Sequence, residues 1–249
     1  MMYMKRLENK VALVTGGGRG MGANITKRLA AEGAAVVLTY SKSAEQSEKI
    51  AAQINAAGGK ALALKADSAF PEEVTSAVNK TIAEFGHIDI LVNNAGIYIG
   101  KAFEAHALED YELIMAVNVR AVYAAALAAV HHMPEAGRII TIGSNMADFA
   151  GGAQSTLYVM SKSALSGLTK GLARDLGPRG ITVNLVQPGP IDTDMNPANT
   201  ELADLLRSRM ALKDYGTGDD VAGLVAFLAS EEGKYITGTA LTIDGGYNA

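Results

Sequence analysis

Tyr158 and Lys162 are four positions apart in the run Tyr158-Val-Met-Ser-Lys162, and Ser144 precedes them by a short interval. If the run is helical, both side chains point in the same direction. A free phenol titrates near ~10, and a neighbouring ammonium group favours its ionised form. Lowering that pKa by roughly 3 units requires about 4 kcal/mol. The pair can then move a proton at neutral pH, although such pairs also occur on helix surfaces with no catalytic role.

The elements that must position these groups alternate between short apolar runs and amphipathic segments, which is typical of strands followed by helices. This alternation predicts an α/β fold, a doubly wound (Rossmann) parallel sheet of about seven strands with helices on both faces. No linker or repeat interrupts residues 1–249, so we expect a single dinucleotide-binding domain. The strands are expected at residues 11–15, 35–39, 61–64, 88–92, 138–142, 181–186 and 240–243. The helices are expected after the first glycine run to residue 32 and at 43–57, 71–85, 108–133, 157–176, 199–212 and 219–229.

One predicted helix start carries a specific capping signal. Ser43-Ala-Glu-Gln46 has the form of a capping box, in which the first and fourth side chains bond each other's backbone N–H groups. We therefore expect the Ser43 hydroxyl to be used in starting the second helix.

Bulk composition excludes several classes of function. The chain has 249 residues and a net charge of -4, which argues against a nucleic-acid polymer or an anionic membrane as a partner held by bulk charge. It has no cysteine, so disulfides and thiolate chemistry are excluded. The N-terminus lacks the apolar core of a signal peptide, and the apolar run 121–130 is too short to span a bilayer. We therefore expect a cytoplasmic protein without a membrane partner.

A glycine-rich turn follows the first predicted strand. Gly16, Gly20 and Gly22 form Gly-x-x-x-Gly-x-Gly between that strand and a helix. Glycine there permits a tight turn and close approach of a pyrophosphate to the helix N-terminus. The spacing differs from Gly-x-Gly-x-x-Gly, and no Gly-Lys-Ser/Thr follows, so a P-loop is disfavoured. The turn predicts a dinucleotide site, although glycine turns also occur without a ligand.

The end of the second predicted strand indicates which dinucleotide binds. NAD enzymes place an acidic residue there for the ribose 2′-hydroxyl, but this chain reads Thr39-Tyr-Ser-Lys-Ser43. Arg19 and Lys42 can instead donate to a 2′-phosphate. We therefore predict that the cofactor is NADP(H). The alternative for Lys42 is that it is an ordinary solvated surface lysine.

Six motifs in order make the chain similar to the short-chain dehydrogenase/reductase family over nearly its whole length. They are the glycine turn, Asn93-Asn-Ala-Gly96, Asn118, Ser144 with the Tyr158–Lys162 pair, Pro188-Gly189 with Thr193, and Asp244-Gly-Gly246. The resemblance implies hydride transfer between NAD(P)H and a carbonyl substrate. It also implies that the cofactor contacts Gly16, Arg19, Gly20, Met21, Gly22, Tyr40, Ser41, Lys42, Asp67, Ser68, Asn94, Ala95, Gly96, Tyr158, Lys162, Pro188, Gly189, Ile191 and Thr193.

The resemblance also assigns catalytic roles. Tyr158 would donate the proton to the carbonyl oxygen, and Lys162 would lower the tyrosine pKa and bind the nicotinamide ribose. Ser144 would hydrogen-bond the carbonyl. Asn118 would hold a water that links Lys162 to solvent. Taken singly, Ser144 is equally a strand-end hydroxyl, and Asn118 an interior polar residue satisfied by backbone.

The substrate side is less well marked in the sequence. Residues 190–212 mix apolar and charged side chains, which suits a mobile lid over a partly apolar pocket. The segment from Asn145 to Gln154 would form the opposite wall of this pocket. The alternative is that it is an ordinary surface loop. The candidate substrate residues are Asn145, Met146, Phe149, Gln154 and Met195. We expect no metal site, since the pair His131-His132 has no evident third ligand.

Small residues on the helices at 108–133 and 157–176 permit close helix approach, and in the resembled family these helices form the dimer seam of a tetramer. We therefore predict a homotetramer. For function, we predict an NADPH-dependent carbonyl reductase related to the 3-oxoacyl-carrier-protein reductases. The run 187–197 also resembles a branch that contains a cyclic-di-GMP-binding regulator of biofilm dispersal. NAD-dependent alcohol oxidation is the third possibility.

Overall fold

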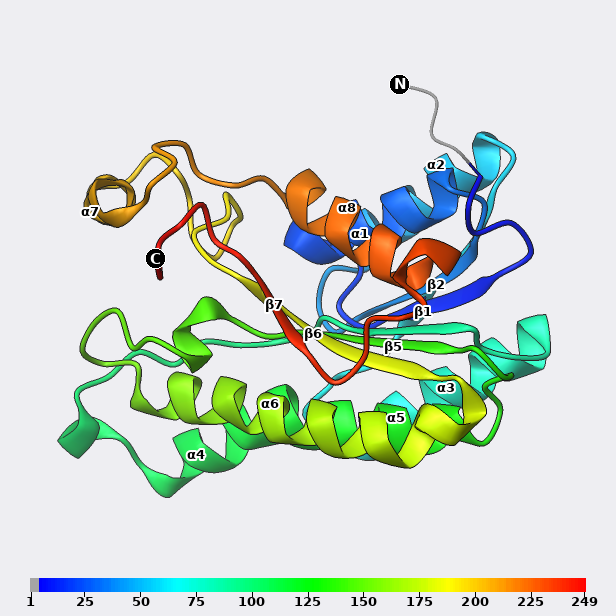
Figure 1. The fold of residues 1–249 in the computed structure, drawn as a ribbon, viewed down its shortest axis with the longest axis horizontal. Coiled ribbons are helices and arrows are strands. Elements are labelled where there is room, and N and C mark those ends of the chain that lie inside the picture. Colours follow the sequence, from blue (N-terminus) through cyan, green and yellow to red (C-terminus); the bar gives the residue numbers. More distant parts are fainter. Residues whose placement is uncertain (1–4) are drawn as a thin grey trace.

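The computed structural model describes residues 5–249 and places seven parallel strands in one sheet, in the order β3-β2-β1-β4-β5-β6-β7 (Figure 1). This arrangement confirms the predicted doubly wound sheet. The chain moves outward from β1 to β3, then returns to the other side of β1, so the switch point lies between β1 and β4. The strands are β1 (Val11–Val14), β2 (Ala35–Tyr40), β3 (Lys60–Lys65), β4 (Ile90–Asn93), β5 (Arg138–Ile142), β6 (Thr182–Pro188) and β7 (Ala240–Ile243).

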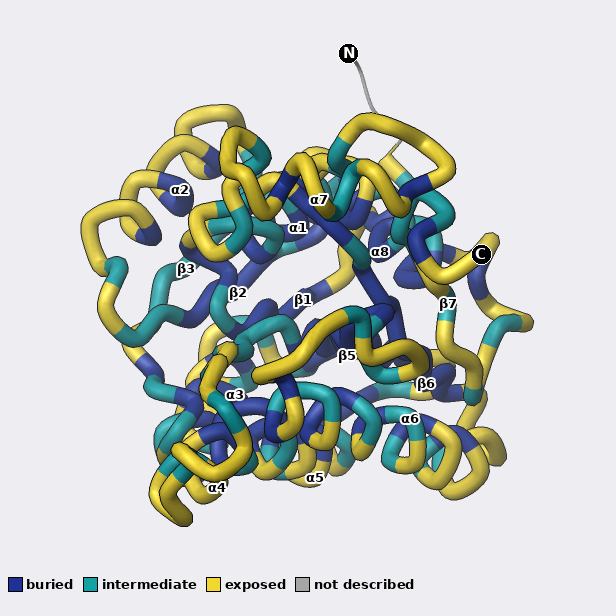
Figure 2. The backbone as a smooth tube through the Cα atoms, turned by 90° about the vertical axis from the view of Figure 1, so that its left-hand side faces the viewer, coloured by how far each residue is buried: buried dark blue, intermediate teal, exposed yellow. Residues whose placement is uncertain are grey.

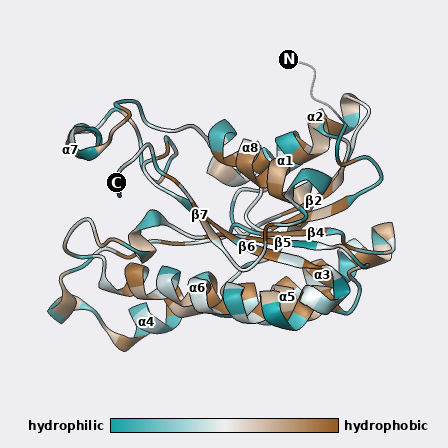
Figure 3. Cartoon of the chain, viewed as in Figure 1, coloured by the Kyte–Doolittle hydropathy of each residue, from teal (hydrophilic) through white to brown (hydrophobic). Residues whose placement is uncertain are grey.

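Helices cover both faces of the sheet. In Figure 1, α1, α2 and α8 lie above it, and α3, α4, α5 and α6 lie below it. Hydrophobic residues predominate in the central strands, and most of the helices carry both hydrophobic and hydrophilic residues (Figure 3). The helices are α1 (Gly20–Ala31), α2 (Ala44–Ala56), α3 (Pro71–Phe85), α4 (Leu108–Met115), α5 (Ala121–Val130), α6 (Thr156–Leu176), α7 (Glu201–Arg209) and α8 (Gly218–Ala229).

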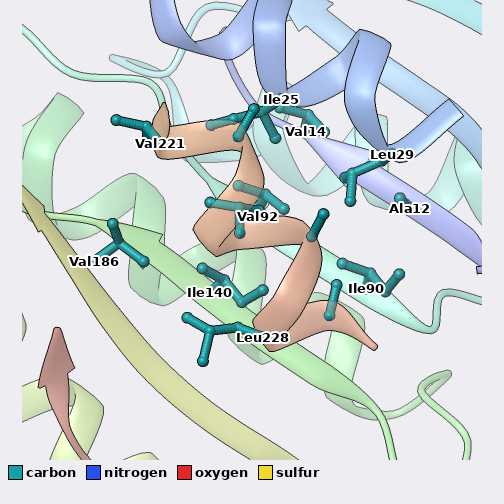
Figure 4. Close-up of a cluster of buried hydrophobic side chains, with 14 of the residues drawn as sticks. Ala12, Val14, Ile25, Leu29, Ile90, Val92, Ile140, Val186, Val221 and Leu228 are labelled. Atoms are coloured by element: carbon teal, nitrogen blue, oxygen red, sulfur yellow. The ribbon is translucent and has the colours of Figure 1, made fainter. Parts of the chain in front are cut away.

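The largest core cluster fixes α1 and α8 on the upper face of the central strands (Figure 4). Ile25 and Leu29 are four positions apart on α1, and both are fully buried in the cluster that also contains Ala12 and Val14 of β1. Val221 and Leu228 of α8 close the same cluster over the neighbouring strands. Burying side chains of this size stabilises the fold by roughly 1.5–3 kcal/mol each. The glycine turn that begins α1 therefore rests on a well-packed base.

The long helix predicted over residues 108–133 is interrupted. A π-helical segment, Ala116–Arg120, separates α4 from α5, and the helix ends at Val130 rather than residue 133. The stretch Leu108–Val130 is long and apolar enough to cross a membrane by length and composition, so the apolar helical stretch extends well beyond the run 121–130. Half of its most apolar window is buried inside the protein, which is typical of a core helix.

The segment between β6 and α8 leaves the sheet and returns to it. Ile191 pairs with Gly216, and the N–H of Asp192 donates to the carbonyl of Gly216 at 2.9 Å. The intervening residues 192–215, which we call the lid, carry α7. In Figure 2 the α7 end of the lid lies on the opposite side of the strand ends from α4, and most of it is exposed.

Candidate active site

The loops that follow β1 and β4 meet at the switch point and are bonded to each other. The Thr15 hydroxyl accepts hydrogen bonds from the N–H groups of Asn94 (3.0 Å) and Ala95 (3.1 Å). In return, the Asn94 side-chain amide donates to the carbonyls of Thr15 (2.9 Å) and Gly16 (3.0 Å). Ligands bind at this position in doubly wound sheets, so the bonds fix the floor of the candidate site.

The glycine turn has the shape of an anion cradle. Gly16 and Gly20 have φ of 63° and 50°, which favours glycine. A Cβ on Gly22 would lie 2.3 Å from the carbonyl oxygen of Gly16. The first turn of α1 therefore packs so closely on the glycine turn that only glycine fits at position 22. Arg19 precedes α1 without a side-chain capping bond, so backbone donors of its first turn remain available to a ligand.

A cleft of about 660 Å³ extends from this turn along the carboxyl ends of the strands. Most of the predicted cofactor residues line it: Gly16, Arg19, Gly20, Met21, Gly22, Tyr40, Ser41, Lys42, Asp67, Ser68, Asn94, Ala95, Gly96, Tyr158, Lys162 and Thr193. Pro188, Gly189 and Ile191 do not. Pro188 ends β6, Gly189 is bonded to the carbonyl of Ile243, and Ile191 is buried at the base of the lid.

The capping box predicted at Ser43 does not form. Ser43 precedes α2 without a side-chain capping bond, and its carbonyl instead accepts from the Ser47 hydroxyl at 2.7 Å. Ser43 lines the cleft with Lys42 and Arg19. An uncapped helix N-terminus with two cations and a hydroxyl is suited to a phosphate group. The capping prediction was wrong because the Ser43 side chain makes no capping bond, and Ser43 borders a cleft that the local sequence does not reveal.

Tyr158 of α6 lines the cleft, and Ser144, which follows β5, hydrogen-bonds it without lining the cleft itself. The Ser144 oxygen accepts from the N–H of Met146 at 3.1 Å, and the same hydroxyl hydrogen-bonds Tyr158. Burial raises the pKa of Tyr158, while a hydrogen bond with Ser144 lowers it and the nearby Tyr98 raises it. The net shift is upward, opposite to the direction expected from Lys162. The phenol is therefore protonated at neutral pH.

Lys162 is buried below Tyr158, with only 4% of its surface exposed. Its Nζ lies 5.7 Å from the centre of the Tyr158 ring and donates to the carbonyl of Ile142 at 2.9 Å. Burial lowers the pKa of Lys162 to about 8, so the ammonium form still predominates at pH 7. The Lys162 charge is directed at a carbonyl rather than at the phenol oxygen, which explains why burial decides the pKa of Tyr158.

Asn118 lies in the π-helical segment, fully buried. Its side-chain oxygen accepts from the N–H of Ile97 (2.9 Å), and its nitrogen donates to the Ile97 carbonyl (3.0 Å) and the Ser161 hydroxyl (3.0 Å). Such segments recur at functional sites because the extra residue in one turn redirects a side chain. A Cβ on Gly96 would lie 3.4 Å from Lys162 Nζ and 3.5 Å from the Asn118 oxygen, so both groups lie beside Gly96.

Sequence reasoning missed two residues that the structure places at this site. Ser161 joins α6 to Asn118 and is one residue before Lys162, a position that is visible in the Tyr158–Lys162 run. Tyr98 packs edge-on against Tyr158 with ring centres 5.1 Å apart, and its hydroxyl donates to the carbonyl of Gln154 at 3.2 Å. Only its closeness to the Asn93–Gly96 motif could have indicated it.

The candidate substrate residues divide into two groups. In the first group, Met195 lines the cleft. Gln154 does not line it, but its carbonyl accepts a hydrogen bond from Tyr98, which packs on Tyr158. Asn145 is buried and bonds the C-terminal segment, Phe149 packs on Tyr247, and Met146 is bound to Ser144 through its backbone N–H. None of these last three lines the cleft, because the loop that carries them faces the C-terminus. Within residues 5–249, no three His, Asp or Glu side chains come together as metal ligands.

The family model described as enoyl-(acyl carrier protein) reductase matches residues 16–248, and the chain belongs to the short-chain dehydrogenase/reductase family. It is 44% identical over 247 residues to the cyclic-di-GMP-binding biofilm dispersal mediator protein of Escherichia coli (strain K12), which covers 99% of this chain and 100% of that protein. A short-chain dehydrogenase from Burkholderia cenocepacia, solved with NADP, is 55% identical with a TM-score of 0.97. A blue fluorescent protein from a metagenomic library, solved with NADPH, is 51% identical with a TM-score of 0.97. In both structural comparisons, 98% of this chain and 100% of the other are covered.

Proposed function

We propose that this protein is an NADP(H)-dependent oxidoreductase that reduces a ketone or other carbonyl compound to an alcohol. The observation that carries the proposal is that Tyr158 and buried Lys162 line the same cleft as the glycine turn, with Ser144 hydrogen-bonded to Tyr158. Membership in a family of dehydrogenases and reductases supports the class of reaction.

NADP(H) is the cofactor that fits the residues present. The glycine cradle at Gly16 and Gly22 suits the pyrophosphate, and Arg19, Lys42 and Ser43 suit a 2′-phosphate. NADP and NADPH are also the cofactors held by the two similar solved structures. When bound, NADPH supplies the hydride to the carbonyl carbon.

The side chains would act on the carbonyl oxygen. Ser144 can turn its hydroxyl proton from Tyr158 to that oxygen and so hold and polarise it, while it continues to accept from the N–H of Met146. Tyr158, protonated at neutral pH, then delivers the proton that the new alcohol needs. Lys162 holds positive charge below the phenol and favours the phenolate left after transfer. Asn118, beside Lys162 at Gly96, would hold the water through which the proton is replaced.

The test measures NADPH consumption against a panel of ketones and a short β-ketoacyl thioester. Tyr158→Phe should lower kcat by roughly 10²- to 10⁴-fold while NADPH still binds. Tyr235→Phe is the matched control, because Tyr235 is 97% exposed and should leave kcat unchanged. Equal rates in wild type and Tyr158→Phe would contradict the assignment. Turnover of the thioester alone would favour a 3-oxoacyl-carrier-protein reductase.

A second candidate function is nucleotide sensing, favoured by the 44% identity to a protein named as binding cyclic-di-GMP. The test is calorimetric titration of cyclic-di-GMP into the protein with and without NADPH. Binding that NADPH abolishes would place both ligands in the same cleft, whereas no heat at micromolar protein would remove this candidate.

We keep a homotetramer in the cytoplasm as the expected state. Exposed apolar side chains on α5 and α6, namely Tyr123, Leu127 and Met160, support association through these helices. Light scattering coupled to size exclusion tests this, and a monomer mass would contradict it.

A further inference from the structure

The C-terminal segment, residues 244–248, contacts both the lid and the loop at residues 145–152 that faces it. The Asn145 side chain donates to Asn248 at 3.1 Å, and the Asn248 side chain donates back to the carbonyl of Asn145 at 2.9 Å. On the lid side, the N–H of Leu212 donates to the carbonyl of Gly245 at 2.9 Å. Figure 1 shows α7 and the C-terminus at the same end of the molecule. Residues 244–248 therefore bridge the two structures that border the candidate substrate entrance.

Arg209, at the end of α7, joins the same cluster directly. Its Nη1 donates to the carbonyl of Gly151 at 2.8 Å and to the Tyr247 hydroxyl at 3.4 Å. The Tyr247 ring lies edge-on to Phe149 with ring centres 6.2 Å apart, and only 8% of Tyr247 is exposed. A Cβ on Gly151 would lie 2.8 Å from the Tyr247 hydroxyl, so the loop fits closely on the tyrosine.

We propose that Arg209 and Tyr247 form a latch that holds the lid against the loop at residues 145–152 and so positions the substrate side of the cleft. Both are positioning residues, since neither lines the cleft. The latch connects separate parts of the chain: Gly151 is 58 positions from Arg209, and Tyr247 is 38. Arg209 is the lid side chain that bonds across to this loop.

The chemistry of the latch suits a lid that must open in each cycle. The bond from Arg209 to Gly151 lies at the surface, where water competes for both partners. The base of the lid is held separately by the pairing of Ile191 with Gly216. Breaking the latch should therefore free α7 and the facing loop together without unfolding the sheet. Contacts of this kind open locally at low free energy.

The inference rests on the proposed reductase, so the first test does not depend on turnover. Amide hydrogen exchange is measured with saturating NADPH for wild type and Arg209→Ala, in peptides covering residues 147–154 and 198–209. Arg209→Ala should speed exchange in both peptides by roughly 3- to 10-fold. Tyr247→Phe, which keeps the ring on Phe149 but loses the hydroxyl, should have a smaller effect in the same peptides.

Arg207→Ala is the matched control on the same helix. Arg207 bonds Asp204 at 2.8 Å and the carbonyl of Ala198, and it stacks on Tyr215 at 4.9 Å, all within the lid. Its loss should speed exchange at 198–209 alone. Unchanged exchange at 147–154 in Arg209→Ala would overturn the latch, as would an equal response of that peptide to Arg207→Ala.

Kinetics then link the latch to the reaction. With the best ketone from the panel, Arg209→Ala should raise KM by roughly 3- to 10-fold, change kcat less than about twofold and leave NADPH affinity intact. Arg209→Lys, which keeps one donor, should recover part of the KM. A fall in kcat at unchanged KM would contradict the positioning role. If wild type reduces no ketone, the proposed function fails, whereas the exchange result still decides the latch.

Discussion

The cofactor side and the substrate side of the cleft are built in different ways. On the cofactor side, the loops after β1 and β4 are tied by backbone groups and by two side chains, Thr15 and Asn94, above a packed core. On the substrate side, the lid and the loop at residues 145–152 meet through the exposed bond of Arg209 to Gly151 and through the C-terminal segment. The bonds on the cofactor side hold its two loops in one geometry, whereas the contacts on the substrate side can break and let the lid move away.

This difference predicts how each side responds to substitution. Changes on the cofactor side should act on folding and NADPH binding, because they leave backbone groups clashing or unpaired. Changes on the substrate side should act on KM with little loss of stability, because solvent replaces the lost contacts.

The largest effect is expected for Gly22→Ala. The new Cβ would meet the Gly16 carbonyl oxygen at 2.3 Å and the Asn94 side-chain nitrogen at 2.5 Å, and the backbone on one side cannot move away. We expect a loss of about 3 kcal/mol or more in unfolding free energy, together with loss of NADPH binding. Urea denaturation and NADPH titration measure both.

Gly223→Ala is the control for Gly22→Ala, since it is also a helix glycine and its Cβ would find only Arg28 at 3.7 Å. It should be neutral or stabilise by about 0.5–1 kcal/mol. If both glycine variants behave alike, the cofactor side is not the rigid part of the molecule.

Lys162→Met should separate stability from function. A lysine pKa lowered from 10.5 to about 8 means that the unfolded chain binds more protons between those pH values, so unfolding free energy rises with pH there. The shift corresponds to about 3 kcal/mol at ~1.36 kcal/mol per unit. At pH 7 the variant should have the larger unfolding free energy. The gain is reduced by the loss of the hydrogen bond from Lys162 to the Ile142 carbonyl. The variant should also be inactive.

Denaturation of wild type and Lys162→Met between pH 7 and 10.5 tests this. The gain of the variant should be full below about pH 8 and disappear toward pH 10.5. If the difference in unfolding free energy between the two proteins did not change with pH, the pKa of Lys162 would not be lowered by burial.

The fold was predictable from sequence because each strand is a short apolar run and each run is followed by a helical pattern. The strand at Arg138–Ile142 and the helix at Pro71–Phe85 have the predicted ends. The π-helical segment was not predictable, since Asn118 adopts it through bonds to Ile97 and Ser161, which are remote in sequence. Local patterns do not contain such contacts.

Thr15→Val tests the cofactor side with a smaller change. Valine keeps the shape but removes the oxygen that accepts from the N–H groups of Asn94 and Ala95. Leaving these part-buried donors unpaired should cost about 1 kcal/mol and weaken NADPH binding. Thr15→Ser retains the hydroxyl and should stay close to wild type in thermal unfolding. Equal losses in both variants would mean that packing of the methyl group, rather than the hydroxyl, ties the two loops.

The cofactor side of the site was also more predictable than the substrate side. Glycines, Asn94 and Lys162 act through backbone geometry and burial, so their positions follow from the order of strands. The substrate wall depends on where loops fold back: Asn145 and Phe149 face the C-terminal segment, and Tyr98 takes the place beside Tyr158. Residue type alone could not decide between these orientations.

Tyr98→Phe should have the smallest effect and tests the substrate side alone. Its hydroxyl bonds the Gln154 carbonyl at 3.2 Å in an exposed position, while its ring packs on Tyr158. Removing the hydroxyl should cost less than about 1 kcal/mol and raise KM for the ketone less than about fivefold. Tyr98→Ala also removes the ring contact and should shift KM further, with NADPH affinity unchanged in both. Loss of NADPH binding in Tyr98→Ala would show that the two sides of the cleft are coupled, which their separate construction argues against.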